Sequence, residues 1–546
     1  MKALLAAPLV MALLAPTAAS LDPSSVGVGH ICRAEQVYAP VKGPRKIAFM
    51  AGVGTGGFPV RTTSPEAQRW FDFGIQLFHA FYHEDGRLAF DRAVAADPDC
   101  AMCRWGQALS RGPTLNFDID DKDTKTALGM AQEALKVSRT DEEKQLARAL
   151  IERYQSKQTA ETEERFASAL LKAVAKDPSK TDIRLIAAEA LLTADRRDDH
   201  SAAVQARSIV EQILKAQPDN TGAIHYYIHA TEAAGDPADA VPYADRLAAL
   251  APGASHLIHM AAHTFIHVGR YEDVAILDAQ ALAVDAEHAK AVDAPGVLGS
   301  PDYYPHNLGF GLAGAMLAGD GPLAVKFADD AKVAFPPGGR ENMGYMSARV
   351  MAAYGRYAPE RALGFAEPKD ADKRILAMWR YARGEALASK GDAKAVLGES
   401  QQIGQVVEQW KKAKKDEQHG ITEAQIAQHV LEGRADMLQG KPDDAAKAFA
   451  TAAAMQEKAK WGMDPPPWWY PVRRSLAAAN LKAGRNADAL REASASLKDW
   501  PADAMALQVR AQAEQRLGQA DKSKADEAAA RAAWRGDPAK VLIDLI

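Results

Sequence analysis

The sequence predicts an all-α protein built as a solenoid of stacked helical hairpins, and three observations support this class. Residues of one type recur with a step of 34: His225 and His259, His229 and His263, Gly235 and Gly269, Pro218 and Pro252. A fixed period of this size indicates stacked helix pairs. Alanine is abundant, Gly and Pro recur at the expected helix ends, and alternating runs of Val, Ile and Thr are lacking. The 546 residues are too many for one compact core but suit an array whose units contact only their neighbours.

The first 20 residues have the pattern of an export signal. Lys2 supplies a positive charge, Ala3 to Ala15 form a short apolar run, and small residues follow at Thr17 to Ser20. The apolar run is too short to span a bilayer, and no later run of about 18 apolar residues occurs. We therefore expect a periplasmic or secreted protein, cleaved near residue 20, with no membrane span.

The remainder of the chain divides by composition. Residues 21–64 are rich in Gly, Pro and Val and predict an irregular N-terminal arm. Ser64-Pro65-Glu66 is a helix start, and hairpins are expected from there to residue 285 as an N-terminal array. Residues 286–305 contain several Pro and Gly and predict an insertion or hinge. A C-terminal array with a polar terminal cap then covers 306–546. The formal net charge of −5 gives no reason to expect a nucleic-acid partner.

Several blocks carry a family resemblance. The segment Gly269 to Ala275 (GRYEDVA), the segment starting at Gly235 (GDPADA) and the Pro residues that close units resemble tetratricopeptide repeats. The blocks DPDCAMCRWG (97–106) and DPPPWWYPVR (464–473), together with the His-rich hairpins, are similar to a subgroup of exported bacterial tetratricopeptide proteins. The resemblance implies a right-handed superhelix, in two arrays here, and a protein or peptide partner.

The histidines between Ala223 and Asp285 form the candidate site. His256, His259, His263 and His267 are spaced by three, four and four residues, so they lie within roughly 80° of arc on one helix face. His225 and His229 form a similar stripe on the preceding hairpin. Because residues one period apart occupy the same height and face of neighbouring helices, we expect the two pairs spaced by 34 to face each other.

The resemblance places all seven candidate histidines on the concave surface. In such repeats, positions 2, 5, 9, 12 and 13 of the first helix face the groove. With Gly235, Gly269 and Gly319 each taken as position 15, the histidines fall at these places: His225 at 5, His229 at 9, His256 at 2, His259 at 5, His263 at 9, His267 at 13 and His306 at 2.

The chemistry of this pattern favours a transition metal. A His-x-x-x-His pair presents two imidazoles to one ion. Neutral imidazoles suit zinc or copper, whereas calcium and magnesium prefer oxygen ligands. We therefore predict a zinc or copper site with a non-catalytic binding role. One alternative is an envelope scaffold whose groove binds a peptide or protein without metal. Another is a metal-dependent hydrolase, for which Glu232 is the nearest candidate base, although the Glu of a His-Glu-x-x-His motif is missing.

Two further groups are candidates. Cys100 and Cys103 form a C-x-x-C pair at a helix start, which indicates a disulfide or, with His79 and His83, a second Cys2His2 metal site; Cys32 is free or an alternative partner. The side chains that a partner would contact are Trp105, Glu232, Trp468, Trp469, Tyr470 and Arg473. The aromatic residues of this set are also expected to seat helix starts, which is the commoner role of Trp in a solenoid.

Overall fold

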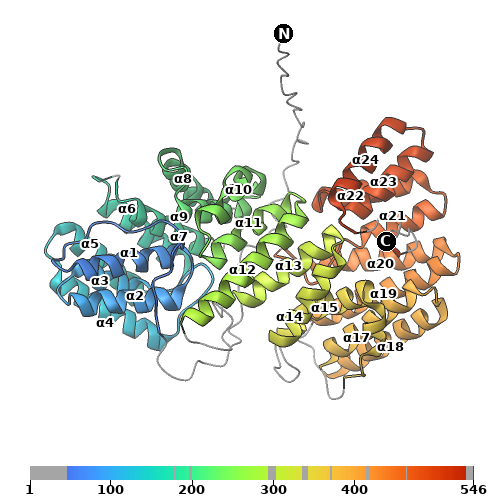
Figure 1. Ribbon diagram of the computed structural model, residues 1–546, viewed down its shortest axis with the longest axis horizontal. Helices are drawn as coiled ribbons and strands as arrows, with labels where there is room; N and C mark the ends of the chain where they lie inside the picture. The colour runs from blue at the N-terminus through green and yellow to red at the C-terminus, as the bar shows by residue number, and fades with distance from the viewer. Residues whose placement is uncertain are drawn as a thin grey trace, which may run out of the picture.

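The computed structural model describes residues 46–177, 179–195, 200–292, 303–334, 342–368, 372–413, 418–462, 464–536 and 545–546. All regular elements of these residues are helical, as the sequence predicts (Figure 1). In the N-terminal half they are α1 (Pro65–His79), α2 (His83–Ala96), α3 (Ala101–Leu109), α4 (Asp121–Val137), α5 (Asp141–Gln155), α6 (Ala160–Ala173), α7 (Thr181–Ala194), α8 (Ser201–Ala216), α9 (Thr221–Ala233), η3 (Pro237–Ala240), α10 (Val241–Leu250), α11 (Ser255–His267) and α12 (Tyr271–Ala291).

The C-terminal half continues with the same kind of element. Its helices are α13 (Tyr304–Ala318), α14 (Gly321–Ala334), α15 (Asn342–Tyr357), α16 (Pro359–Gly364), α17 (Lys373–Ser389), α18 (Ala393–Ala413), α19 (Gln418–Leu438), α20 (Pro442–Ala459), α21 (Arg473–Lys482), α22 (Asn486–Asp499), α23 (Ala504–Arg516) and α24 (Ala520–Ala533). Consecutive helices pack against each other along the whole series, which makes the chain a tetratricopeptide-type solenoid of hairpins.

Local sequence explains where the helices begin. The Ser64 side chain accepts a hydrogen bond from the Ala67 backbone N–H, and Pro65 opens α1. Asn220 caps α9 in the same way through the Ala223 backbone N–H. Such caps satisfy backbone N–H groups that have no partner inside the helix. The helix start expected at Ser64-Pro65-Glu66 is therefore present.

Glycine ends the first helix of many hairpins. The residues with a left-handed conformation at this place are Gly235, Gly269, Gly319, Gly391, Gly440, Gly484 and Gly518, with φ from 71° to 82°. Glycine adopts this conformation without the steric cost that a Cβ atom adds. The recurrence of these glycines in the sequence thus reflects one turn geometry, repeated from unit to unit.

The two halves are connected both along the chain and across it. Helix α12 continues to Ala291, inside the region 286–305 that was expected to be an insertion, and α13 begins at Tyr304, before the end of that region. The two helices pack directly on one another. The last helices return to the middle of the solenoid, where the Arg535 backbone N–H donates to the Ala318 carbonyl at 2.8 Å. A Cβ atom on Gly269 would lie 2.1 Å from the Pro501 carbonyl oxygen, so this turn needs glycine for packing as well.

Part of the sequence interpretation falls outside the described residues. This applies to the export signal (1–20), to residues 21–45 of the arm including Cys32, and to residues 293–302 of the insertion. The described part of the arm, 46–64, has no regular helix and contacts the start of α9, where the Thr55 backbone N–H donates to the Thr221 hydroxyl. Within the described residues, no helix combines the length and apolarity needed to cross a membrane.

Candidate metal centre

Six of the seven candidate histidines gather into two groups of three. In each group the ring nitrogens lie within 4.8 Å of one another. The first triad is His225 and His229 from α9 with His256 from α11, and the second is His259 and His263 from α11 with His306 from α13. Both triads therefore use positions 5 and 9 of one unit and position 2 of the next. The pairs related by 34 residues do not share one site, because each pair combines with a histidine of the following helix.

The first triad has the spacing of metal ligands. The Nε2 atom of His225 lies 3.2 Å from Nε2 of His229 and 3.2 Å from Nε2 of His256. Nitrogen ligands at 2.0–2.1 Å from a tetrahedral ion are about 3.3–3.4 Å apart. The three Nε2 atoms are thus placed much as they would be around one ion.

A hydrogen bond of His225 determines which of its ring nitrogens carries the lone pair. His225 Nδ1 donates to the His79 backbone carbonyl at 2.7 Å, so its Nε2 atom carries the lone pair. His229 and His256 both point Nε2 at this same atom, while their buried Nδ1 atoms have no hydrogen-bond partner among the described residues. An ion bound by the three Nε2 atoms would leave these Nδ1 atoms without a partner, because each ring presents only one of its two nitrogens to an ion.

The second triad is held from outside by carboxylates. His259 Nδ1 lies 2.7 Å from Asp278 of α12, and His263 Nδ1 lies 3.3 Å from Glu232 of α9. The Nε2 atoms of His263 and His306 are 3.3 Å apart, and the buried Nε2 of His259 has no hydrogen-bond partner in the described part of the chain. A carboxylate on the far ring nitrogen is a common support for a metal-binding histidine, because it orients the ring and raises its basicity.

Burial favours the neutral form of five of the six imidazoles. It lowers the pKa of the His229 imidazole to about 3, with a further lowering by the charge of His263. Burial, followed by the neighbouring histidines, also holds the pKa values of four other ligands well below their usual range: His225, His256, His259 and His306. Metal ions bind the neutral form of the ring, so these pKa shifts favour metal binding at neutral pH.

The carboxylates differ in charge. Burial alone would raise the pKa of Glu232, but the charges and hydrogen bonds of His263 and His267 hold it well below its usual range. The pKa of Asp278 is raised well above its usual range by burial, which the charge of His263 only partly offsets. Glu232 is thus an anion beside the second triad, whereas Asp278 becomes one when a cation nearby compensates its burial.

One phenylalanine covers each triad. The ring centroid of Phe81 lies 4.4, 6.1 and 5.1 Å from those of His225, His229 and His256. Phe310 lies 4.8, 4.6 and 4.9 Å from His259, His263 and His306.

Phe81 has an unusual backbone. It follows α1 with φ 56°, in the left-handed conformation that glycine adopts after later first helices. A bulky residue in this conformation is strained, and such strain persists mostly at functional sites.

One more carboxylate reaches the site from far along the sequence. Asp464 Oδ1 lies 3.6 Å from His306 Nε2. The segment that carries Asp464 is held by Arg349, whose Nη2 donates to the Pro465 carbonyl at 3.0 Å and also to that of Pro466. The first part of the DPPPWWYPVR block thus brings an oxygen ligand close to the second triad.

His267 and Glu232 are neighbours of the site. His267 Nε2 lies 3.0 Å from Glu232 Oε1, and His267 belongs to neither triad. Glu232 contacts the Nδ1 side of His263, so its position is that of a group that orients a ligand. The hydrolase hypothesis needs a base on the Nε2 side, and this contact does not supply one.

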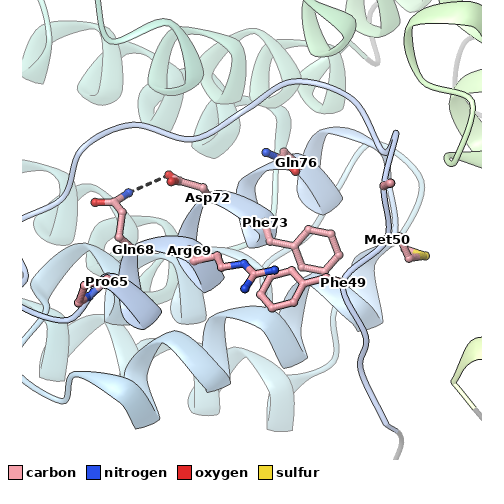
Figure 2. A pocket seen from close by; sticks show the side chains of 9 residues that line it. Phe49, Met50, Pro65, Gln68, Arg69, Asp72, Phe73 and Gln76 are labelled. Atoms are coloured by element: carbon pink, nitrogen blue, oxygen red, sulfur yellow. Dashed lines mark hydrogen bonds between the residues drawn. The ribbon is translucent and has the colours of Figure 1, made fainter.

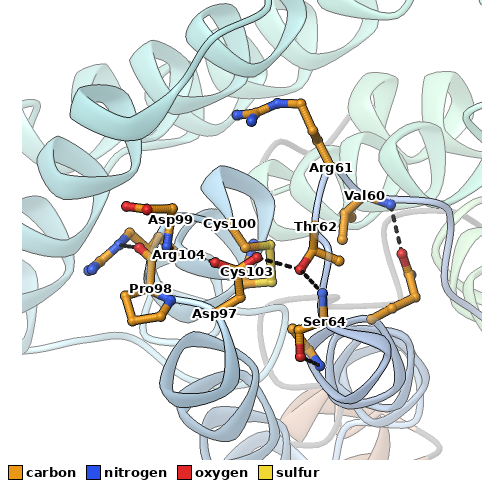
Figure 3. Close-up of a disulfide and its surroundings, with 12 residues drawn as sticks. Val60, Arg61, Thr62, Ser64, Asp97, Pro98, Asp99, Cys100, Cys103 and Arg104 are labelled. Atoms are coloured by element: carbon orange, nitrogen blue, oxygen red, sulfur yellow. Dashed lines mark hydrogen bonds between the residues drawn. A yellow bond between two sulfur atoms is a disulfide. The ribbon is translucent and has the colours of Figure 1, made fainter.

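Cys100 and Cys103 are joined in a disulfide at the start of α3. Figure 3 shows it beside Thr62 and Asp97, whose side chains are hydrogen-bonded. His79 Nε2 lies 3.0 Å from Asp182 and His83 Nε2 lies 3.2 Å from the Tyr303 hydroxyl. Of the two arrangements expected for these cysteines, the structure has the disulfide, and the four residues do not form a common ligand set.

The aromatic partner-binding candidates are buried. Trp105 Nε1 donates to the Leu146 carbonyl, and Trp469 Nε1 donates to the Tyr381 hydroxyl. Trp468 and Tyr470 are fully buried as well. These rings fill the space between helices, which was the alternative role expected for them. Arg473 is partly exposed and forms ion pairs with Glu457 and Glu492.

A separate recess lies where the N-terminal arm crosses α1. Figure 2 shows its lining residues, which include Phe49, Arg69, Asp72 and Phe73, around a volume of about 570 Å³. The Phe49 ring lies under the Arg69 guanidinium at 3.9 Å. Burial raises the pKa of Asp72 to about 6, although the Gln68 side chain donates to it. This recess could not be predicted from the sequence, because the arm has no periodicity that would place it against α1.

The sequence also gave little signal for the groups that surround the triads. Phe81, Phe310, Asp278 and Asp464 lie outside the histidine stripes and come from separate segments. One feature of the sequence points to Phe81: it occupies the position at which glycine ends the first helix of later hairpins.

Comparison with known proteins gives distant structural likenesses only. The sequence matches no protein-family model and no curated protein. The chain is similar to the crystal structure of the P58(IPK) TPR domain, with 13% identity, a TM-score of 0.22, and coverage of 84% of this chain and 99% of that one. For the human IFIT1 dimer with m7Gppp-AAAA, the values are 13%, 0.28, 87% and 91%. For the APC/C hetero-tetramer Cut9-Hcn1, they are 12%, 0.27, 83% and 78%.

Identities and scores this low carry no argument about activity. The class rests on the chain's own hairpins, turn glycines and 34-residue step, which define a tetratricopeptide-type solenoid. Two buried histidine triads lie inside it, between α9, α11 and α13.

Proposed function

We propose that this protein binds transition-metal ions, zinc or copper, at the two histidine triads, in a role that does not require catalysis. The observation that carries the proposal is the convergence of three ring nitrogens in each triad, within 4.8 Å of one another. Three buried neutral imidazoles are a ligand set for zinc and copper. The buried Nε2 atom of His259, which has no hydrogen-bond partner in the described part of the chain, supports it.

We further propose that the protein is exported, as the resemblance to exported bacterial tetratricopeptide proteins implies. The leader pattern of residues 1–20 and the disulfide between Cys100 and Cys103 support this, since disulfides persist in oxidising compartments. N-terminal sequencing of the protein from its native cell tests export; a chain that still begins at Met1 would contradict it.

Metal analysis of the untagged protein tests the main proposal. We expect up to two ions per chain in the wild type. The double variant His259→Ala with His263→Ala removes two ligands of the second triad, so it should lose about one ion per chain. The matching variant His225→Ala with His229→Ala should lose the other.

Two controls separate loss of ligands from loss of fold. His429→Gln changes a histidine of α19 that pairs with Glu432 outside both triads, and it should leave the metal content unchanged. Circular dichroism should show that the double variants remain helical. Metal content that is the same in the wild type and both double variants would refute the proposal.

The alternative of a partner-binding scaffold remains the second candidate. The recess between the arm and α1 favours it, because an arginine, a carboxyl group and two phenylalanines line one open volume. A partner that co-purifies with the wild type, survives chelation and is lost on Arg69→Ala would support this candidate.

A further inference from the structure

The two triads are close enough to act together. His256 and His259 belong to different triads but lie three residues apart on α11. Their ring centroids are 5.9 Å apart, and those of His229 and His263, also from different triads, are 6.0 Å apart. Ring centroids within a triad are 4.8 to 5.4 Å apart. Rings of different triads are thus only slightly farther apart than rings of one triad, and two bound ions would be direct neighbours.

The donor set suits copper for such a pair. Six imidazoles supply the ligands, and imidazole suits copper as well as zinc. The contacts of Asp278 and Glu232 with the triads are made at Nδ1 atoms, so neither carboxylate lies on the Nε2 side where an ion would bind. Asp464 Oδ1 lies 3.6 Å from Nε2 of His306 and 4.0 Å from Nδ1 of His263, both in the second triad. Neither Asp278 nor Glu232 is therefore placed to bridge two ions, and an external ligand would supply the bridge.

The residues around the two triads limit the size and the charge of that external ligand. Phe81, Phe310 and Tyr303 pack against the imidazoles, with the Tyr303 centroid 4.3 Å from that of His256. Five of the six histidines are no more than 2% exposed and His306 is 9% exposed. Burying two doubly charged ions together in such a site is costly, whereas two cuprous ions carry half the charge. A small uncharged molecule suits these surroundings better than a bulky or ionic substrate.

We propose that the two triads form one dinuclear copper centre that binds dioxygen between its ions, an inference that rests on the proposed metal-binding function. With three histidine ligands for each ion, a position stays open for the external ligand. On binding, each cuprous ion gives one electron, so the dioxygen gains two and becomes a peroxide that bridges two cupric ions. Two copper–oxygen bonds form, the bond between the oxygen atoms remains, and no proton moves. Release reverses the same electron transfers.

Oxygen uptake by the copper-loaded protein tests the proposal. The untagged wild type is loaded with cuprous chloride under argon, excess copper is removed, and dioxygen is added. We expect two copper ions per chain and one dioxygen per two copper ions. The oxidised centre should give almost no electron paramagnetic resonance signal, because two bridged cupric ions couple their spins. Removing dioxygen under vacuum should restore the cuprous form.

Variants of the protein distinguish the proposed dinuclear centre from the proposed metal-binding function. His256→Ala breaks the first triad but leaves the second, so it should keep about one copper ion and lose oxygen uptake; on chemical oxidation it should show the signal of an isolated cupric ion. His429→Gln should behave as the wild type. Two copper ions with two separate cupric signals and no oxygen uptake would overturn the dinuclear centre and leave the metal-binding function intact. Failure of the wild type to bind either copper or zinc would overturn both.

Discussion

The two triads use the same repeat positions but have different surroundings. In the first triad, His225 is held by a backbone carbonyl, and the Nδ1 atoms of His229 and His256 have no described hydrogen-bond partner. In the second, Asp278 and Glu232 contact two of the rings. Carboxylate partners raise the basicity of a ligand and offset the charge of an ion. The two triads therefore share the repeat positions of their histidines but not the groups that hydrogen-bond to those histidines. We expect the second triad, which has the carboxylates, to bind a cation more tightly.

Removal of the covering rings should have the largest effect. Phe81 and Phe310 are almost completely buried, so Phe81→Ala or Phe310→Ala should lower the free energy of unfolding by about 3–5 kcal/mol, measured by urea denaturation with a chelator present. Phe81→Gly should cost about 1–2 kcal/mol less than Phe81→Ala, because glycine adopts the left-handed conformation without strain. Equal losses for Ala and Gly at position 81 would show that its backbone is not strained.

Metal should stabilise the wild type more than a variant with one triad. A ligand at 100 times its Kd stabilises the folded state by about 2.7 kcal/mol per site. The wild type should gain from two sites, and the His225→Ala, His229→Ala variant from the second only. Thermal unfolding with zinc and with chelator measures both gains. A variant that gains as much as the wild type would contradict the presence of a metal site at the first triad.

Asp278→Asn should affect one triad alone. Loss of a carboxylate behind a ligand typically weakens metal binding by about 10–100-fold, so the affinity of the second triad should fall by that factor. The affinity of the first triad in the same variant is the internal control. Competition with a coloured chelator resolves the two sites, and an equal loss at both would contradict the asymmetry.

The smallest effect concerns pH in the metal-free protein. The pKa of His229 is about 3 in the folded state, below the ordinary value of about 6.5 expected for the unfolded chain. Between these values the unfolded state binds more protons, so His229 destabilises the fold by about 1.4 kcal/mol for each unit that the pH falls. His229→Gln should remove this part of the slope, measured by urea unfolding at pH 7 and pH 5. An unchanged slope would mean that His229 already carries a proton in the folded state.

Much of the fold could be predicted from the sequence because it depends on local order. The step of 34 residues, Ser64 at the start of α1 and the glycines after first helices are each visible in the chain, and each reflects short-range geometry. The resemblance to tetratricopeptide repeats predicts that seven histidines lie on the concave face, and six of the seven form the two triads.

The sequence showed the grouping of those histidines into two triads less clearly than it showed the fold. A simple step of 34 pairs His225 with His259, whereas the third ligands come from position 2 of the next unit. His256 and His306, which occupy that position, are separated by 50 residues because α12 is long and a further segment precedes α13. Periodicity alone therefore did not show that there are two sites of three.

The sequence by itself determined that this chain is a helical solenoid with histidines along one inner face, because helix period and repeat length are properties of neighbouring residues. Only the tertiary structure decided which rings share a site, that Phe81 and Phe310 cover them, and that Asp278 and Asp464 approach the second triad. Those contacts join segments far apart in the chain, and their geometry depends on how the hairpins stack.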